Sequence, residues 1–312
     1  RQAAEKLIHD GVTDFIGMGR GLIAEPQWVN KVASGREDCL RKCISCNIGC
    51  IGNRLANNVG IHCTINPDLI HNDEYKEKKV SRPTNVVVVG GGPGGLYAAY
   101  ILALRGHKVT LLEKKQELGG NFRIAAYPTG KGQLTEAVRS MIVRCENAGV
   151  AIRTGVEADE AVLRSLSPDA IVLVTGSNPL ILRIPGLSEC GFMTAQELLD
   201  GKRSAGRKAL VVGGMVGCEA AEFLAERGHA VSVIEMKDVI AADVTPESCR
   251  YMFEAFREHN VGLYPGAKVG QFYTDGVDYT LADGTPGSLR SFDSIVLAMG
   301  SRANAALQET AE

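Results

Sequence analysis

The chain has 312 residues, of which 45% are hydrophobic and 22% are charged, and its formal net charge is −2. This length suggests about two domains with room for sizeable cores, and the composition is typical of a soluble globular protein. The near-neutral charge, without a long basic run, excludes nucleic acid as an expected partner. The 36 glycines are many, as turn-rich nucleotide-binding folds require.

The amino-terminal residues predict a helix over residues 1–10 and then a buried strand, VTDFIG, over residues 12–17. The charged opening RQAAEKLIHDG gives no sign of a signal peptide, so we expect a cytoplasmic protein. Gly19 and Arg20 follow the predicted strand, ahead of an amphipathic stretch to Val32. A strand ending in Gly-Arg can present main-chain N–H groups and a guanidinium to a phosphate, as the last βα loops of a TIM barrel do. Most Gly-Arg pairs, however, are ordinary turns.

Five of the nine cysteines crowd together, namely Cys39, Cys43, Cys46, Cys50 and Cys63. In a cytosolic setting such a group favours metal over disulfides. The spacing C-x2-C-x3-C-x12-C, from Cys43 to Cys63, suits a cubane iron–sulfur cluster with three close thiolates and a distant fourth. Zinc sites more often show paired C-x2-C knuckles, so structural zinc is the alternative. Cys39 falls outside the set and is expected to be free.

The other four cysteines, Cys145, Cys190, Cys218 and Cys249, are scattered singly and are expected to be small buried apolar residues. Between the cysteine segment and the next domain, residues 66–83 carry the charged run HNDEYKEKK. This stretch is more typical of a solvated connection than of a binding surface.

A strand–turn–helix–strand pattern begins at Val86 and ends at Glu113. Gly90, Gly92 and Gly95 form G-x-G-x-x-G directly after four valines. The first glycine permits a tight turn, the second lets the backbone approach a pyrophosphate, and the third allows close packing of helix and strand. The helix then directs its unpaired N–H groups at the phosphates, and Glu113 stands where a carboxylate can accept hydrogen bonds from ribose. We therefore predict a dinucleotide site.

The stretch 86–104 contains no charged residue, which could be mistaken for a membrane span. Its five glycines and Pro93 indicate a strand, a turn and a buried helix instead.

The same pattern recurs over residues 209–235, where Arg227-Gly228-His229 repeats Arg-Gly-His of the first copy and Glu235 repeats Glu113. When Gly217 is aligned with Gly95, the first glycine of the motif falls on Val212, leaving Gly213, Gly214 and Gly217. Alternatively, the turn is one residue shorter. Either register predicts a second dinucleotide site, although a degenerate site is the alternative.

A further echo supports duplication of a whole domain. The apolar run 171–176 matches the run 295–300, and each ends in glycine. Two dinucleotide domains in one chain imply redox chemistry.

Together these features resemble one family. The segments GMGRGLIAEPQWVNKVASGRED, CISCNIGC and LGGNFRIAAYPTGKGQL are similar to the carboxyl-terminal half of the 2,4-dienoyl-CoA reductase and 2-enoate reductase group, relatives of old yellow enzyme. The resemblance implies an α/β fold with two Rossmann-like dinucleotide-binding domains. It divides the chain into the last βα unit of a TIM barrel (1–38), an iron–sulfur segment and linker (39–82), an FAD domain (83–182), an NAD(P)H domain (183–304) and the start of a return to the FAD domain (305–312).

The resemblance also implies cofactor-binding residues. Those for the FMN phosphate are Gly19 and Arg20, and the cluster ligands are Cys43, Cys46, Cys50 and Cys63. Those lining FAD are Gly90, Gly92, Gly95, Glu113, Gly119, Gly120, Thr175 and Gly176. Those lining the nicotinamide dinucleotide are Gly213, Gly214, Gly217 and Glu235.

On this resemblance, electrons pass from NAD(P)H to FAD, through a 4Fe-4S cluster to FMN, and then to an activated C=C bond of an enoate or enoyl thioester. The substrate barrel and the catalytic residues are expected to lie outside this chain, so no catalytic residue is assigned. Small molecules are the expected partners, a membrane is not, and a homo-oligomer is possible. Because Glu235 would repel the 2′-phosphate of NADPH, we expect a preference for NADH, which nearby Lys237 could soften.

Three other interpretations stay open. An amine dehydrogenase of the trimethylamine type has a similar layout but passes its electrons to a flavoprotein. A disulfide reductase would need a C-x-x-C near the FAD motif, and Cys43 and Cys46 precede that motif by some forty residues. A zinc-stapled nucleotide-sensing module would bind without catalysis.

Overall fold

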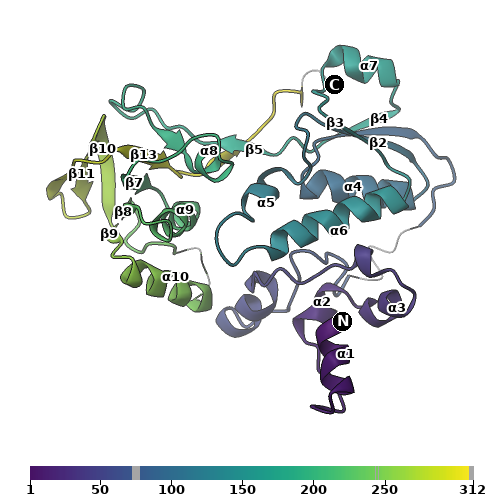
Figure 1. The fold of residues 1–312 in the computed structure, drawn as a ribbon. Helices are drawn as coiled ribbons and strands as arrows, with labels where there is room; N and C mark the ends of the chain where they lie inside the picture. Colours follow the sequence, from purple (N-terminus) through teal and green to yellow (C-terminus); the bar gives the residue numbers. More distant parts are fainter. Residues whose placement is uncertain (72–77, 243, 245, 309–312) are drawn as a thin grey trace. The chain divides into compact units, whose positions relative to one another are not determined.

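The computed structural model describes residues 1–71, 78–242, 244 and 246–308 (Figure 1). The chain divides into two compact units. Unit 1 comprises Arg1–Arg123, Gly132–Val174 and Leu307–Glu312, and unit 2 comprises Ile124–Lys131 and Thr175–Ala306. The charged part of the predicted linker, at 72–77, and the last residues of the predicted return segment, at 309–312, lie outside the described residues.

The amino-terminal part of unit 1 is helical and irregular. Its elements are α1 (Gln2–His9), α2 (Arg20–Ala24), α3 (Trp28–Ala33), a 3-10 turn η1 (Glu37–Cys39) and a π-helix η2 (Ile48–Ala56). The helix predicted over residues 1–10 is therefore confirmed as α1.

The buried strand predicted over residues 12–17 is wrong. This segment forms no strand, and it leaves Val12 68% and Phe15 87% exposed. The apolar pattern is that of a strand, but a strand forms only where a neighbour pairs with its N–H and C=O groups. No described strand of this chain pairs with residues 12–17.

The rest of unit 1 is built on a four-stranded parallel sheet in the order β3-β2-β1-β4. Its elements are β1 (Asn85–Val89), α4 (Pro93–Leu104), β2 (Lys108–Glu113), α5 (Gly120–Ile124), α6 (Gln133–Asn147), β3 (Ala151–Thr154), α7 (Glu160–Leu166) and β4 (Ala170–Leu173). Alternate residues of β1 face opposite sides: Val88 packs with residues of α4 and α6, whereas Val87 and Val89 pack with Leu163 of α7. Figure 1 shows α4 and α6 side by side on one side of this sheet. The sheet is therefore covered on both faces, as buried parallel sheets are.

Unit 2 contains a five-stranded parallel sheet in the order β6-β13-β7-β8-β9, a three-stranded antiparallel sheet β10-β11-β12, and the pair β5-β14. The bounds are β5 (Ser177–Pro179), β6 (Met193–Thr194), α8 (Ala195–Leu199), β7 (Lys208–Val212), α9 (Met215–Ala225), β8 (Ala230–Ile234), α10 (Pro246–Glu258), β9 (Gly262–Tyr264), β10 (Ala267–Tyr273), β11 (Gly276–Leu281), β12 (Pro286–Leu289), β13 (Ser294–Leu297) and β14 (Ser301–Ala303).

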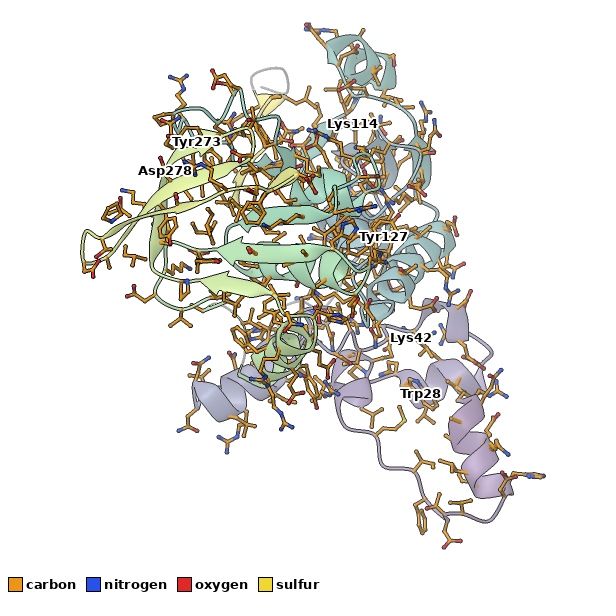
Figure 2. The ribbon with its side chains drawn as sticks, turned by 60° about the vertical axis from the view of Figure 1, so that its left-hand side comes forward. Trp28, Lys42, Lys114, Tyr127, Tyr273 and Asp278 are labelled. Atoms are coloured by element: carbon orange, nitrogen blue, oxygen red, sulfur yellow. The ribbon has the colours of Figure 1, made fainter. Side chains whose placement is uncertain are left out.

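Unit 2 is layered. One face of the parallel sheet packs on α8, α9 and α10, and the other packs on Phe272 and Val277 of the antiparallel sheet. Tyr273 and Asp278, labelled in Figure 2, meet on that antiparallel sheet, where the tyrosine hydroxyl donates to the carboxylate at 2.8 Å. Each unit is thus built on a parallel sheet with helices packed on it, which confirms the predicted α/β fold class.

The repeated Arg-Gly-His has a structural role in both units. His107 Nδ1 lies 2.8 Å from the Thr84 hydroxyl, and His229 Nδ1 lies 2.6 Å from the Gly206 carbonyl oxygen. Each histidine therefore ties the segment after a helix to the residues just before the strand that leads into that helix, β1 in unit 1 and β7 in unit 2.

The apolar stretch 86–104 forms β1, a turn and α4, as predicted. Among the described residues, no helix is both long and apolar enough to cross a membrane.

Candidate functional site

The first glycine turn joins β1 to α4 at the point where the strand order of the unit 1 sheet reverses, between β1 and β4. Ligands of open α/β sheets bind at this kind of position. Gly90 has φ +115°, which a side chain would strain. A Cβ on Gly95 would lie 1.8 Å from the Gly90 carbonyl oxygen, whereas a Cβ on Gly92 would meet nothing within 4 Å. Gly95 thus serves packing, and Gly92 leaves open space beside the N-terminus of α4, the kind of position at which dinucleotide folds bind a pyrophosphate.

Glu113, at the end of β2, accepts a main-chain hydrogen bond at each carboxylate oxygen, one of them from this turn. The main-chain N–H of Gly91 donates to Oε2 at 2.7 Å, and that of Lys115 donates to Oε1 at 2.9 Å. Each carboxylate oxygen has two lone pairs, so each keeps one for a ribose hydroxyl. The two bonds fix the orientation of the carboxylate before any ligand binds.

The structure brings Gly119 and Gly120 to the same turn. The N–H of Gly119 donates to the Gly91 carbonyl oxygen at 2.8 Å, and a Cβ on Gly120 would lie 3.4 Å from the Gly92 Cα. Six residues predicted to line FAD therefore gather in unit 1, namely Gly90, Gly92, Gly95, Glu113, Gly119 and Gly120.

Thr175 and Gly176, also predicted to line FAD, belong to unit 2. Both are hydrogen-bonded to the main chain of Asn304. The Thr175 hydroxyl donates to the Asn304 carbonyl oxygen at 2.6 Å, and the Asn304 N–H donates to the Gly176 carbonyl oxygen at 2.9 Å. Their contact with FAD stays a prediction.

The second glycine turn is one residue shorter than the first. Val212 is the last residue of β7 and pairs with Ile234, so the register that puts the first glycine of the motif on Val212 is wrong. Gly213 takes that position. Its φ is +129°, and its N–H donates to the Ile234 carbonyl oxygen at 3.0 Å, as the N–H of Gly90 does to Leu112 at 2.8 Å. This turn also lies where the strand order reverses, between β7 and β13.

The packing glycine of the second turn is less constrained than that of the first. A Cβ on Gly217 would lie 3.3 Å from Val211 Cγ1 and 3.4 Å from the Ala298 Cβ, so small shifts of side chains would accommodate it. Gly214 precedes α9, and a Cβ there would lie 3.1 Å from Glu235 Oε2. Glu235 is only 6% exposed, and its Oε1 accepts the N–H of Lys237 at 2.9 Å. All four residues predicted for the nicotinamide dinucleotide therefore gather at this turn.

Four cysteines line one small cavity in unit 1. They are the predicted ligands Cys43, Cys46, Cys50 and Cys63, and apolar side chains of Ile23, Ile44 and Ile65 complete much of the wall. Among the described residues, no three His, Cys, Asp or Glu side chains form a site for a single metal ion. The four thiols nevertheless line one common space.

The loop that carries the first three cysteines is turned by left-handed residues at Ser45 (φ +55°) and Asn47 (φ +57°). Gly49 packs so closely on the next chain segment that a Cβ would lie 2.4 Å from the His62 ring. Polar groups also reach the sulfur atoms: the N–H of Ser45 lies 3.4 Å from Cys43 Sγ, and the Thr64 hydroxyl lies 3.3 Å from Cys46 Sγ. Such hydrogen bonds to sulfur tune the potential of a cluster.

Arg20 lies at the start of α2, lines the cysteine cavity and donates a hydrogen bond to the Asn47 side chain. The resemblance found in the sequence implies that Gly19 and Arg20 bind an FMN phosphate. The five N–H donors of a guanidinium allow a second partner, so that role stays a prediction. The contact with the cysteine loop was not foreseen, because Arg20 and Asn47 are far apart in the sequence.

The remaining cysteines lie away from the cavity. Cys39, Cys145, Cys190 and Cys218 are buried, and Cys249 is half-buried. Burial raises the pKa of Cys145 to about 11 and, together with the charge of Glu235, that of Cys218 to about 12. These thiols are therefore poor nucleophiles at neutral pH, which agrees with the expected packing role.

Residues 84–312 match the family described as pyridine nucleotide-disulphide oxidoreductase. An NADH oxidase of Thermoanaerobacter brockii is 41% identical over 303 residues, covering 95% of this chain and 46% of that protein. A bilirubin reductase of Mediterraneibacter gnavus is 34% identical over 306 residues, covering 96% of this chain and 47% of that protein. The chain thus spans about half the length of the curated relatives that it matches.

A similar solved structure is the complex of 2-naphthoyl-CoA reductase with 2-naphthoyl-CoA. It matches with a TM-score of 0.94 and 27% identity, covering 100% of this chain and 47% of that one.

Proposed function

Since this chain belongs to the pyridine nucleotide-disulphide oxidoreductase family, we propose that it is the electron-relay portion of an NADH-dependent flavin and iron–sulfur oxidoreductase. The relatives confirm its resemblance to the carboxyl-terminal part of the enoate reductase family, and family membership indicates FAD and NAD(P)H as cofactors. In the proposed relay, electrons pass from NADH through FAD and a 4Fe-4S cluster to FMN, for reduction of an activated C=C bond in an enoate or enoyl thioester.

The observation that carries the proposal is the cavity walled by Cys43, Cys46, Cys50 and Cys63 in a chain that also has two dinucleotide turns. Dinucleotide binding alone gives no reason for four thiols to line one space. Iron–sulfur clusters do require such an arrangement, because cysteine thiolates hold them. When bound, flavin would accept two electrons from the nicotinamide donor and release them one at a time, and the cluster would carry these single electrons.

In this proposal, individual residues of unit 1 bind FAD and FMN. The open space at Gly92 admits the FAD pyrophosphate, and the amino-terminal N–H groups of α4 bind it. Glu113, held by two main-chain donors, orients the ribose. Gly19 and Arg20 are proposed to hold the FMN phosphate, with Arg20 also placing a positive charge at the cysteine cavity.

In unit 2, Gly213, Gly214 and Gly217 shape the pocket for the nicotinamide dinucleotide, and Glu235 selects it. A buried carboxylate at the ribose accepts hydrogen bonds from the free 2′-hydroxyl of NADH and repels the 2′-phosphate of NADPH. The proposed donor is therefore NADH, which also fits the NADH oxidase among the relatives.

The test is the content of iron, acid-labile sulfide, zinc and flavin in anaerobically purified protein, followed by addition of NADH. The proposal expects about four irons and four sulfides per chain, and bleaching of the flavin absorbance by NADH. Zinc without sulfide would overturn the relay and favour a nucleotide-binding module. Iron and flavin without bleaching by NADH would favour an amine dehydrogenase of similar layout.

A further inference from the structure

A buried carboxylate, Glu25, contacts the start of the cysteine segment at Arg41. It is 1% exposed, and its Oε2 accepts a hydrogen bond from Lys31 Nζ at 2.5 Å and from the Arg41 main-chain N–H at 3.2 Å. Burial raises the pKa of Glu25, but the bonds from Lys31 and Arg41 outweigh it and hold the pKa below its usual range. A charge buried in this way is stable only with its partners, so Glu25 fixes the position of Arg41.

Arg41 extends this network to a second carboxylate. Its side chain is 12% exposed, and its Nη1 lies 3.0 Å from Asp68 Oδ2. The other oxygen of Asp68 accepts the Tyr97 hydroxyl at 3.2 Å, and Tyr97 belongs to α4, the helix of the first dinucleotide turn. Arg41 is thus held between Glu25 and Asp68, and Asp68 between Arg41 and Tyr97.

The positions of Arg41 and Asp68 along the chain give this ion pair its significance. Arg41 precedes Cys43 by two residues, and Asp68 follows Cys63 by five, so the pair joins the two ends of the segment that holds all four cysteines. Next to it, Asn66 donates its main-chain N–H to the Cys63 carbonyl oxygen at 3.2 Å and its side-chain amide to the Ile23 carbonyl oxygen at 2.8 Å. Neither Arg41 nor Asp68 lines the cavity.

We propose that the Arg41–Asp68 ion pair, seated on buried Glu25, is a clamp that holds Cys63 opposite the other three cysteines before any cluster is assembled. The inference rests on the proposed function for the identity of the bound group. Bringing the ends of a long loop together carries an entropy penalty. With the ends already joined, the fourth thiol is in place when iron arrives, and cluster assembly does not include that penalty. Arg41 and Asp68 are positioning residues, since they act through the chain ends and touch no cysteine.

The test compares Asp68→Ala with a matched control, Lys42→Ala. Lys42 is adjacent to Arg41 and forms an exposed ion pair with Glu136 of α6 at 2.9 Å, but it does not join the segment ends; Figure 2 labels it. Two rates are measured on the full chain: maleimide modification of Cys63 without metal, followed by peptide mass, and loss of iron to a chelator after reconstitution. Asp68→Ala is expected to raise both rates about tenfold, equivalent to about 1.4 kcal/mol. Lys42→Ala is expected to leave both unchanged.

Two further variants keep the test decisive. Tyr97→Phe removes one hydrogen bond to Asp68 but leaves the ion pair, so it should shift both rates in the same direction as Asp68→Ala but by less. Asp68→Asn keeps the shape of the side chain and should also shift both rates in the direction of Asp68→Ala. The clamp is overturned if maleimide modifies Cys63 in Asp68→Ala and in Asp68→Asn at the wild-type rate. If the wild type binds no iron but the difference in Cys63 modification persists, the clamp stands and the proposed cluster falls.

Discussion

The main-chain N–H of Gly91 donates a 2.7 Å hydrogen bond to Glu113 Oε2. This bond joins the glycine turn of unit 1 to the end of the adjacent strand, so the carboxylate and the backbone of the turn form one rigid group. The second turn is one residue shorter, and a Cβ on Gly214 would lie 3.1 Å from Glu235 Oε2, the same distance as a Cβ on Gly91 would lie from Glu113 Oε2. Both turns therefore bring a glycine close to the carboxylate that follows the adjacent strand.

The packing glycines of the two turns should differ in tolerance. Gly95→Ala would force a Cβ to 1.8 Å from a main-chain oxygen, whereas Gly217→Ala meets side-chain atoms at 3.3 Å and beyond. We expect Gly95→Ala to destabilise by several kcal/mol, as overpacking against backbone does, and Gly217→Ala by about 1 kcal/mol or less. Thermal melts followed by circular dichroism measure both. Equal losses would contradict the assigned packing.

Gly92→Ala should separate binding from folding. A Cβ at this position meets no atom within 4 Å, so the melting temperature should stay near that of the wild type. It would occupy the space proposed for the pyrophosphate, so FAD affinity should fall by about tenfold or more, a loss of about 1.4 kcal/mol. Titration of the unliganded protein with FAD, followed by flavin fluorescence, gives this affinity. If the variant bound FAD with wild-type affinity, the pyrophosphate would not bind at this turn.

Glu235→Gln should reduce the discrimination between NADH and NADPH. The wild type should bind NADH at least about tenfold more tightly, because a like charge opposite the 2′-phosphate disfavours NADPH. Removal of the charge should strengthen NADPH binding and weaken NADH binding. Fluorescence titration with each nucleotide measures the two constants. Comparable affinities in the wild type would contradict the proposed preference.

Arg20→Gln should make the proposed cluster harder to reduce, because it removes a positive charge from the cavity wall. Arg54→Gln is the matched control: Arg54 lies in the same segment, binds Asn58 at 2.8 Å and does not line the cavity. A redox titration followed by electron paramagnetic resonance should show a lower potential for Arg20→Gln alone. Identical shifts in the two variants would mean that Arg20 has no specific effect.

Tyr97 should make stability depend on alkaline pH. Burial and the neighbouring Asp68 raise its pKa to about 12 from an ordinary value of 10. A raised folded-state pKa means that the stabilisation is fully present below pH 10 and is lost as pH rises toward 12. Urea unfolding at a series of pH values should show this fall, reduced in Tyr97→Phe. Cys145 and Cys218, whose pKa values are also raised, add to the fall in both proteins.

Much of the fold could be predicted from local patterns. Each strand, glycine turn and helix of the two repeated units spans about thirty residues, and its conformation follows from glycine placement and apolar periodicity within that span. Six predicted FAD residues and all four predicted nicotinamide-dinucleotide residues accordingly gather at their turns. The same local reasoning failed at residues 12–17, because a strand pattern specifies a strand only where another strand pairs with it.

The sequence by itself determined the two dinucleotide turns and the grouping of the cysteines, since both depend on residues that are near one another along the chain. Tertiary structure alone decided the length of the second turn, through the pairing of Val212 with Ile234. It also decided that Arg41, Asp68 and Glu25 share one network, in which Glu25 is buried and Arg41 and Asp68 are half-buried. Burial of Glu25 excludes water and leaves its charge dependent on partners that include Arg41, which is distant in sequence. No spacing rule along the chain encodes such a pairing.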